Sequence, residues 1–150
     1  MTASVDTALD RLRRQDASAP AADATLTIAE MAERTGVSAH TLRYYERIGL
    51  LSVARDTAGY RLYTAGDYAR VVFLNRMRMT GMSIRDLQRY IALVGEGEAS
   101  VPERLQMLLA HRDAIRAQIQ ELTFALDTVE FKIAAYGGHP EPTHIRKDAS

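Results

Sequence analysis

Residues 41–51 of this 150-residue chain read Thr41-Leu42-Arg43-Tyr44-Tyr45-Glu46-Arg47-Ile48-Gly49-Leu50-Leu51. Two adjacent tyrosines stand beside an arginine in a stretch that favours a short helix and stops at a glycine. Ten residues further on, the chain is again aromatic and basic, with the run Gly59-Tyr60-Arg61-Leu62-Tyr63. A basic helix followed by a basic, aromatic turn can hold a DNA groove and the phosphate strand beside it. The two runs together predict a DNA-binding element.

The segment before residue 41 predicts a helix-turn-helix. Thr27-Ile28-Ala29-Glu30 has the form of a capping box and starts a helix that we expect to end near Thr35. Gly36-Val37-Ser38 predicts a tight turn, with glycine in a left-handed conformation and Ser38 capping a second helix from about Ala39 to Ile48. Two helices of about nine residues joined by three residues form this motif. Its expected core is Ile28, Met31, Ala32, Val37, Leu42 and Tyr45.

The segment after residue 49 predicts a wing and two more helices. Residues 50–63 alternate between apolar and polar with Gly59 as a turn residue, which favours a short hairpin. Capping patterns at Thr64 and Ser83 predict helices over about 64–81 and 83–95. Residues 95–98 then form an acidic joint.

A heptad repeat fills the C-terminal third of the chain. Ser100-Val101-Pro102-Glu103 predicts a capped helix start, and apolar residues then recur at spacings of three and four as far as Tyr136, with Arg112 as an interruption. A helix of this length is about 55 Å long and cannot bury its apolar stripe against a domain of about 70 residues. Pairing with the same helix of a second copy is the simplest way to bury the stripe, and the alternative is that the helix folds back on its own domain. The expected dimer contacts are Leu105, Leu108, Ile115, Ile119, Leu122, Leu126, Val129 and Ile133.

Charge is distributed unevenly along a chain whose net charge is zero. Residues 27–95 contain ten arginines, no lysine and six acidic residues, so this segment carries +4 and the remainder −4. Such a basic segment is typical of a nucleic-acid footprint, although a set of solvated surface arginines would give the same count.

The expected DNA contacts lie at the start of the second helix and on the wing. The helix presents Ser38, His40, Thr41, Arg43 and Tyr44, and the wing presents Tyr60, Arg61 and Tyr63. Their hydroxyl, imidazole and guanidinium groups can bond to base edges or phosphates. The structural alternatives are that Tyr45 belongs to the core and that Arg43 and Arg61 pair with Glu46 or Asp56.

These motifs together resemble the MerR family of transcriptional regulators. The resemblance covers residues 27–136 and also includes Thr80-Gly81-Met82-Ser83-Ile84; the closing helix resembles the small aldehyde- and stress-responsive branch. It implies a dimer with an antiparallel coiled coil, bound to a pseudo-palindromic promoter whose spacer is bent and untwisted for RNA polymerase. It also assigns contacts to Arg43, Tyr44, Tyr60, Arg61 and Tyr63, and leaves His40 as a candidate for sequence choice.

The chain lacks the sensors of other branches of that family. It has no cysteine, and only 14 residues follow Tyr136, so neither a thiol sensor nor an appended ligand domain is expected. Three readings of the signal that this protein responds to stay open: an unidentified small organic effector, a partner protein, or no signal at all. His139 and His144 could bind a metal, but we expect no metal site and no cofactor.

The overall expectation is a mainly α protein without catalytic activity. It comprises a disordered N-terminal tail (1–24), a winged helix-turn-helix DNA-binding domain (25–96), a coiled-coil dimerisation helix (99–136) and a mobile C-terminal tail (137–150). No nucleophile–base constellation or phosphate loop predicts an enzyme. No apolar run spans a membrane, and the N-terminus does not suggest export, so we expect a cytoplasmic protein. The alternative function is a coiled-coil adaptor whose winged domain binds protein instead of DNA.

Overall fold

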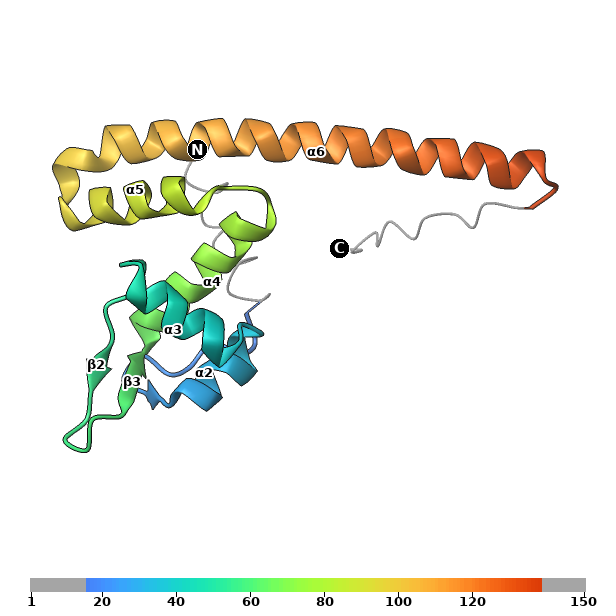
Figure 1. Ribbon diagram of the computed structural model, residues 1–150. Helices are drawn as coiled ribbons and strands as arrows, with labels where there is room; N and C mark the ends of the chain where they lie inside the picture. Colours follow the sequence, from blue (N-terminus) through green and yellow to red (C-terminus); the bar gives the residue numbers. More distant parts are fainter. Residues whose placement is uncertain (1–15, 139–150) are drawn as a thin grey trace, which may run out of the picture. The chain divides into compact units, whose positions relative to one another are not determined.

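The computed structural model describes residues 16–138 and divides the chain into two compact units. The boundary falls between Arg104 and Leu105, inside the longest helix (Figure 1). The described elements are β1 (Thr25–Leu26), α2 (Ile28–Thr35), α3 (Ala39–Arg47), β2 (Ala54–Arg55), β3 (Arg61–Thr64), α4 (Ala65–Met79), α5 (Ile84–Gly95), a 3-10 turn η1 (Glu98–Ser100) and α6 (Val101–Ala135). The expected mainly α architecture is confirmed.

Helices α2 and α3 form the expected helix-turn-helix. The Thr27 hydroxyl accepts a hydrogen bond from the Glu30 amide, and the Glu30 carboxylate accepts one from the Thr27 amide, both at 3.2 Å. Gly36 ends α2 with φ +72° and donates its amide to the carbonyl of Ala32. Ser38 then caps α3 by accepting from the Thr41 amide at 3.1 Å. These bonds satisfy amides and carbonyls that helix ends leave unpaired, and they fix where α2 ends and α3 begins.

The wing is the β2–β3 hairpin within a three-stranded antiparallel sheet of order β1-β3-β2. Ala54 lies opposite Leu62 and Arg55 opposite Arg61, while Leu26 of β1 lies opposite Tyr63. The hairpin turn is closed by Asp56, whose carboxylate accepts the amides of Ala58 and Tyr60 at 2.9 Å. The expected hairpin over residues 50–63 is therefore present, whereas β1 was missed because a two-residue strand has no readable alternation.

The core of the first unit joins the helix-turn-helix to α4 and the sheet. Of the six residues expected in this core, four are buried and Ile28 and Ala32 pack against them. Tyr63, Val71 and Leu74 add fully buried side chains from β3 and α4. The remaining buried members are Leu26, Leu50, Leu51, Tyr68, Met82 and Leu87. Helix α3 thus packs one face against this core and leaves its other face toward solvent.

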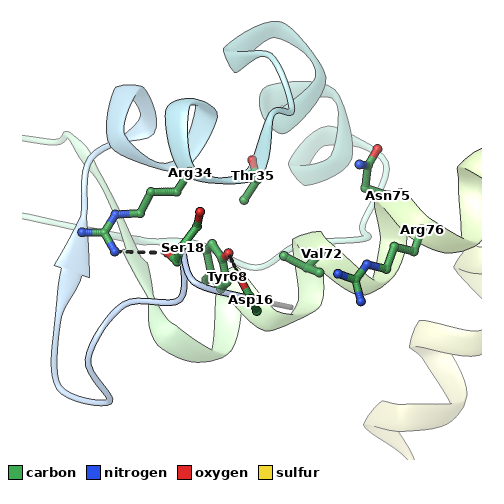
Figure 2. A pocket seen from close by; sticks show the side chains of 8 residues that line it. All are labelled: Asp16, Ser18, Arg34, Thr35, Tyr68, Val72, Asn75 and Arg76. Atoms are coloured by element: carbon green, nitrogen blue, oxygen red, sulfur yellow. Dashed lines mark hydrogen bonds between the residues drawn. The ribbon is translucent and has the colours of Figure 1, made fainter. Parts of the chain in front are cut away.

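Residues 16–24, which we call the N-terminal strap, differ from the expected tail. The Tyr68 hydroxyl on α4 donates to the Asp16 carboxylate at 2.5 Å, and the Arg34 guanidinium on α2 donates to the Ser18 carbonyl at 3.2 Å (Figure 2). The strap, α2 and α4 line a hollow of about 200 Å³. The strap is therefore attached to the first unit, while residues 1–15 of the expected tail lie outside the described part of the chain.

The start of α6 is anchored differently from the expected capping box. The Ser100 hydroxyl donates to the carbonyls of Leu93 and Gly97, and Glu103 forms an ion pair with Arg89 of α5. The expected acidic joint over residues 95–98 runs from the last residue of α5, Gly95, to the first residue of the 3-10 turn η1, Glu98. Ser100 thus links η1 to the end of α5. Glu103 pairs with a residue of α5 instead of capping the start of its own helix.

The second unit consists, among its described residues, of α6 from Leu105 onward and the turn that follows it. Gly137 adopts φ +79°, and the amide of Gly138 returns to the carbonyl of Ile133 at 2.9 Å, which ends the helix. Within residues 16–138, no helix has the length and apolarity required for a membrane span.

The expected seam of α6 is open in the single chain. Leu108 and Ile115 are half-buried. The other six predicted dimer contacts are each at least 40% exposed: Leu105, Ile119, Leu122, Leu126, Val129 and Ile133. Water-exposed leucine, isoleucine and valine at heptad spacing favour a partner helix.

Candidate nucleic-acid interface

The outer face of α3 carries the expected contact residues of the recognition helix. Ser38, His40 and Arg43 are exposed, and Thr41 and Tyr44 are half-buried. Leu42 and Tyr45 point the opposite way, into the core. The 3.6-residue period of the helix therefore separates a polar face available to DNA from an apolar face that fixes its position.

Ser38 and Thr41 already share hydrogen bonds at the start of α3. The Ser38 hydroxyl donates to the Thr41 hydroxyl at 3.0 Å and accepts from the Thr41 amide. The Thr41 hydroxyl proton has no acceptor among the described residues. Thr41 can therefore donate to a base or phosphate without breaking the cap, whereas Ser38 would have to give up a bond.

Tyr44 is held at the surface of α3 by two neighbours. The Arg47 guanidinium lies 5.4 Å from the centre of its ring, and the Tyr45 ring lies 6.3 Å away at 43°. Burial raises the pKa of Tyr45, with nearby Arg78 acting in the opposite direction. Tyr45 is thus a neutral core residue, and Arg47 is a cation of this surface that the sequence-based set omitted.

The wing presents Tyr60 and Arg61 in different ways. Tyr60, at the hairpin turn, is 73% exposed. The Arg61 side chain is only 25% exposed, because its Nε donates to Glu46 Oε2 of α3 at 2.6 Å. This hydrogen bond raises the pKa of Arg61 above its ordinary value, and it therefore favours the charged form that arginine already has.

Glu46 also contacts the other strand of the wing. Its Oε1 lies 3.5 Å from Arg55 Nη2, and Arg55 Nη1 donates to the Gly59 carbonyl at 2.9 Å. Neither Glu46 nor Arg55 was among the expected site residues, although an Arg61–Glu46 pair was considered from the sequence. Arg43, the other candidate for such a pair, has no salt-bridge partner in the described part of the chain.

Tyr63 does not belong to the exposed surface. Its side chain is fully buried, and its hydroxyl makes no hydrogen bond in the described structure. Burial raises the pKa of Tyr63, so it is a neutral phenol in the core. The expectation that Tyr63 contacts DNA is corrected accordingly: of the wing residues expected there, the accessible ones are Tyr60 and Arg61.

No cluster of three or more metal-ligating side chains occurs among residues 16–138. His139 and His144, the pair considered for a metal, lie outside the described residues.

Comparisons with known proteins agree on one family. The model of the MerR HTH family regulatory protein matches residues 26–93, and a second model, described as MerR, DNA binding, matches residues 68–130. An uncharacterized HTH-type transcriptional regulator of Haemophilus influenzae is 38% identical over 113 residues, which is 75% of this chain and 84% of that protein.

Two solved structures are similar along most of their length. HiNmlR, described as a MerR family regulator lacking the sensor domain and bound to promoter DNA, is 37% identical with a TM-score of 0.73, covering 76% of this chain and 87% of its own. A MerR family regulator from Listeria monocytogenes is 41% identical with a TM-score of 0.70 and the same coverage. The chain, with its helix-turn-helix, wing and long C-terminal helix, belongs to the MerR family of helix-turn-helix regulatory proteins.

Proposed function

We propose that this protein is a dimeric transcriptional regulator that binds a pseudo-palindromic promoter through the exposed face of α3 and the wing. The observation that carries the proposal is that α3, which bears the exposed Arg43 and Arg47, is joined through its Glu46 to Arg55 and Arg61 of the wing. A helix for the groove and an attached cationic hairpin for the phosphates are the two parts that such binding requires.

The roles divide by exposure and chemistry. His40 and Arg43 are exposed near the start of α3, which supports assigning them to base edges and the adjoining backbone. Tyr60 and Arg61 are suited to phosphates outside the groove, because a phenol and a guanidinium both donate to phosphate oxygens. Promoter-bound HiNmlR supports this use of the fold.

The dimer would set the spacing of two such surfaces on a promoter. With its heptad stripe exposed, α6 supplies a self-complementary seam, and two-fold symmetry matches the symmetry of a pseudo-palindromic site. We further propose that the bound promoter is bent and untwisted so that RNA polymerase can engage it, the energy coming from the added protein–phosphate contacts.

A gel-shift titration with the DNA upstream of the protein's own gene tests the interface. Arg61→Ala should weaken binding to all duplexes about equally and lower the slope of log K against log salt by about one. Arg43→Ala should weaken binding as well. Arg116→Ala, which removes an exposed arginine from α6, is the matched control and should leave affinity unchanged.

The opposite result has a defined meaning. If neither arginine on the α3–wing surface affects affinity at low salt, that surface does not bind DNA. If the wild-type chain binds no duplex at all, the adaptor alternative replaces DNA-binding regulation.

A further inference from the structure

Glu46 is an acidic residue in the middle of a surface that is proposed to face phosphates. It lies on α3, one turn from Leu42 on the chain, and its side chain is 23% exposed. A free carboxylate at this position would repel DNA. Its two oxygens instead accept from one arginine on each strand of the wing.

The register of the wing explains why an acid is needed there. Arg55 and Arg61 lie directly opposite each other on β2 and β3. Like charges at opposed positions destabilise a strand pair, and strands of two and four residues have few bonds with which to resist. A carboxylate between the two guanidiniums removes this repulsion and leaves the group with a net charge of +1.

The pairing also determines which atoms of Arg61 remain available. Its Nε–H is used by Glu46 at 2.6 Å, and neither of its Nη groups has an acceptor in the described part of the chain. The two Nη groups are the outer donors of a planar fork, and they suit a phosphate bidentately. Arg55, in contrast, has one Nη on Glu46 and the other on the Gly59 carbonyl.

We propose that Glu46 is a positioning residue for DNA binding: it fixes the wing to the recognition helix and directs the free Nη groups of Arg61 at a backbone phosphate. This inference rests on the proposed DNA-binding function. It makes a counter-intuitive prediction, because removing a negative charge from a DNA-binding surface should tighten binding if charge alone mattered, whereas loss of positioning should weaken it.

The experiment uses the full chain and the duplex that the wild-type protein selects from a random pool. Glu46→Gln keeps the shape of the side chain but weakens the link to both arginines, and it should weaken binding about tenfold. The salt slope should fall toward that of Arg61→Ala, since the same phosphate contact is lost. Glu33→Gln is the matched control: it makes the same charge change at an exposed site on α2 and should leave affinity unchanged or slightly higher.

A double-mutant cycle separates positioning from general loosening of the wing. In the Arg61→Ala background, Glu46→Gln should cause a much smaller loss, because the group that it positions is gone and only its 3.5 Å contact with Arg55 remains. The inference is overturned if Glu46→Gln tightens binding in the wild-type background, or if it weakens binding equally in both backgrounds.

The same measurements distinguish failure of the proposed DNA-binding function from failure of the role of Glu46. If Arg61→Ala has no effect on a duplex that the wild-type chain binds, the wing contact itself is wrong. If Arg61→Ala weakens binding and Glu46→Gln does not, only the role of Glu46 is wrong.

Discussion

Tyr68 is the residue through which the N-terminal strap is joined to α4. Its side chain is 3% exposed, and its hydroxyl donates to Asp16 (Figure 2). Burial, together with the hydrogen bond to Asp16, raises the pKa of Tyr68 from 10.0 to about 12. Because the folded pKa is above the unfolded one, the neutral phenol stabilises the fold fully below pH 10, and this contribution is lost as pH rises toward 12.

We therefore expect Tyr68→Phe to lower the free energy of unfolding by about 1 kcal/mol at pH 8, the usual net worth of a buried hydrogen bond. The difference in the free energy of unfolding between wild type and variant should shrink between pH 10 and 12. Over this range the wild type loses the contribution of the neutral Tyr68 phenol, whereas the phenylalanine variant has no such group. Urea unfolding across this pH range measures both effects. Tyr90→Phe is the control, since that hydroxyl bonds to no described residue; equal effects of the two substitutions would refute the role of the strap.

At the scale of the elements, Gly36 determines where helix α2 ends. It ends α2 at φ +72°, and a Cβ built there would meet no atom within 4 Å. The need for glycine is thus one of backbone conformation and not of space. Gly66, in the first turn of α4, lies outside the positive-φ region and would place a Cβ only 3.6 Å from the Thr64 hydroxyl oxygen, an ordinary contact.

The two glycines should consequently respond to alanine with opposite signs. Gly36→Ala should destabilise the chain by about 1 kcal/mol, because a left-handed conformation disfavours any Cβ. Gly66→Ala should be neutral or stabilise by up to about 0.5 kcal/mol, because alanine restricts the unfolded chain and favours helix. Urea titrations of the two variants are the measurement, and a loss at Gly66 as large as that at Gly36 would contradict this account of the turn.

Local signals made most of these elements predictable. The capping residues Thr27, Ser38 and Thr64 bond as their spacing predicts, because a cap involves atoms within three residues of each other. The two-residue strand β1 carries no pattern. The link from Tyr68 to Asp16 joins residues 52 positions apart, which no local motif reveals.

The wing shows the same limit within the candidate site. Alternation along β3 predicts that either Leu62 or Tyr63 points inward, but only the contacts of β3 with α2 and α4 decide that Tyr63 is buried. The opposed arginines Arg55 and Arg61 likewise follow from the strand register, and the register depends on the turn at Asp56. Which side chains are accessible was therefore predictable on α3, where the helical period suffices, and less so on the wing.

At the scale of the whole molecule, α6 exposes apolar side chains on two faces, and only one of these faces belongs to the expected dimer seam. Leu122 belongs to the heptad seam and is 70% exposed, whereas Phe124, two residues on, is 75% exposed. Two residues turn the helix by about 200°, so these side chains lie on opposite sides. The heptad pattern included Leu122 and passed over Phe124 and Phe131, which repeat at seven residues but outside the seam.

This pair of neighbours makes a direct test of the dimer. Leu122→Asp should raise the dimer dissociation constant by at least about a hundredfold, because a carboxylate in the seam would be buried without a partner in both helices. Phe124→Asp makes a similar change on the outer face, so it should leave the dimer intact. Sedimentation at several protein concentrations distinguishes the two outcomes. If Leu122→Asp remains a dimer, or if Phe124→Asp dissociates it equally, α6 does not associate through its heptad stripe, and the spacing of two α3 helices on a promoter must be set by another surface.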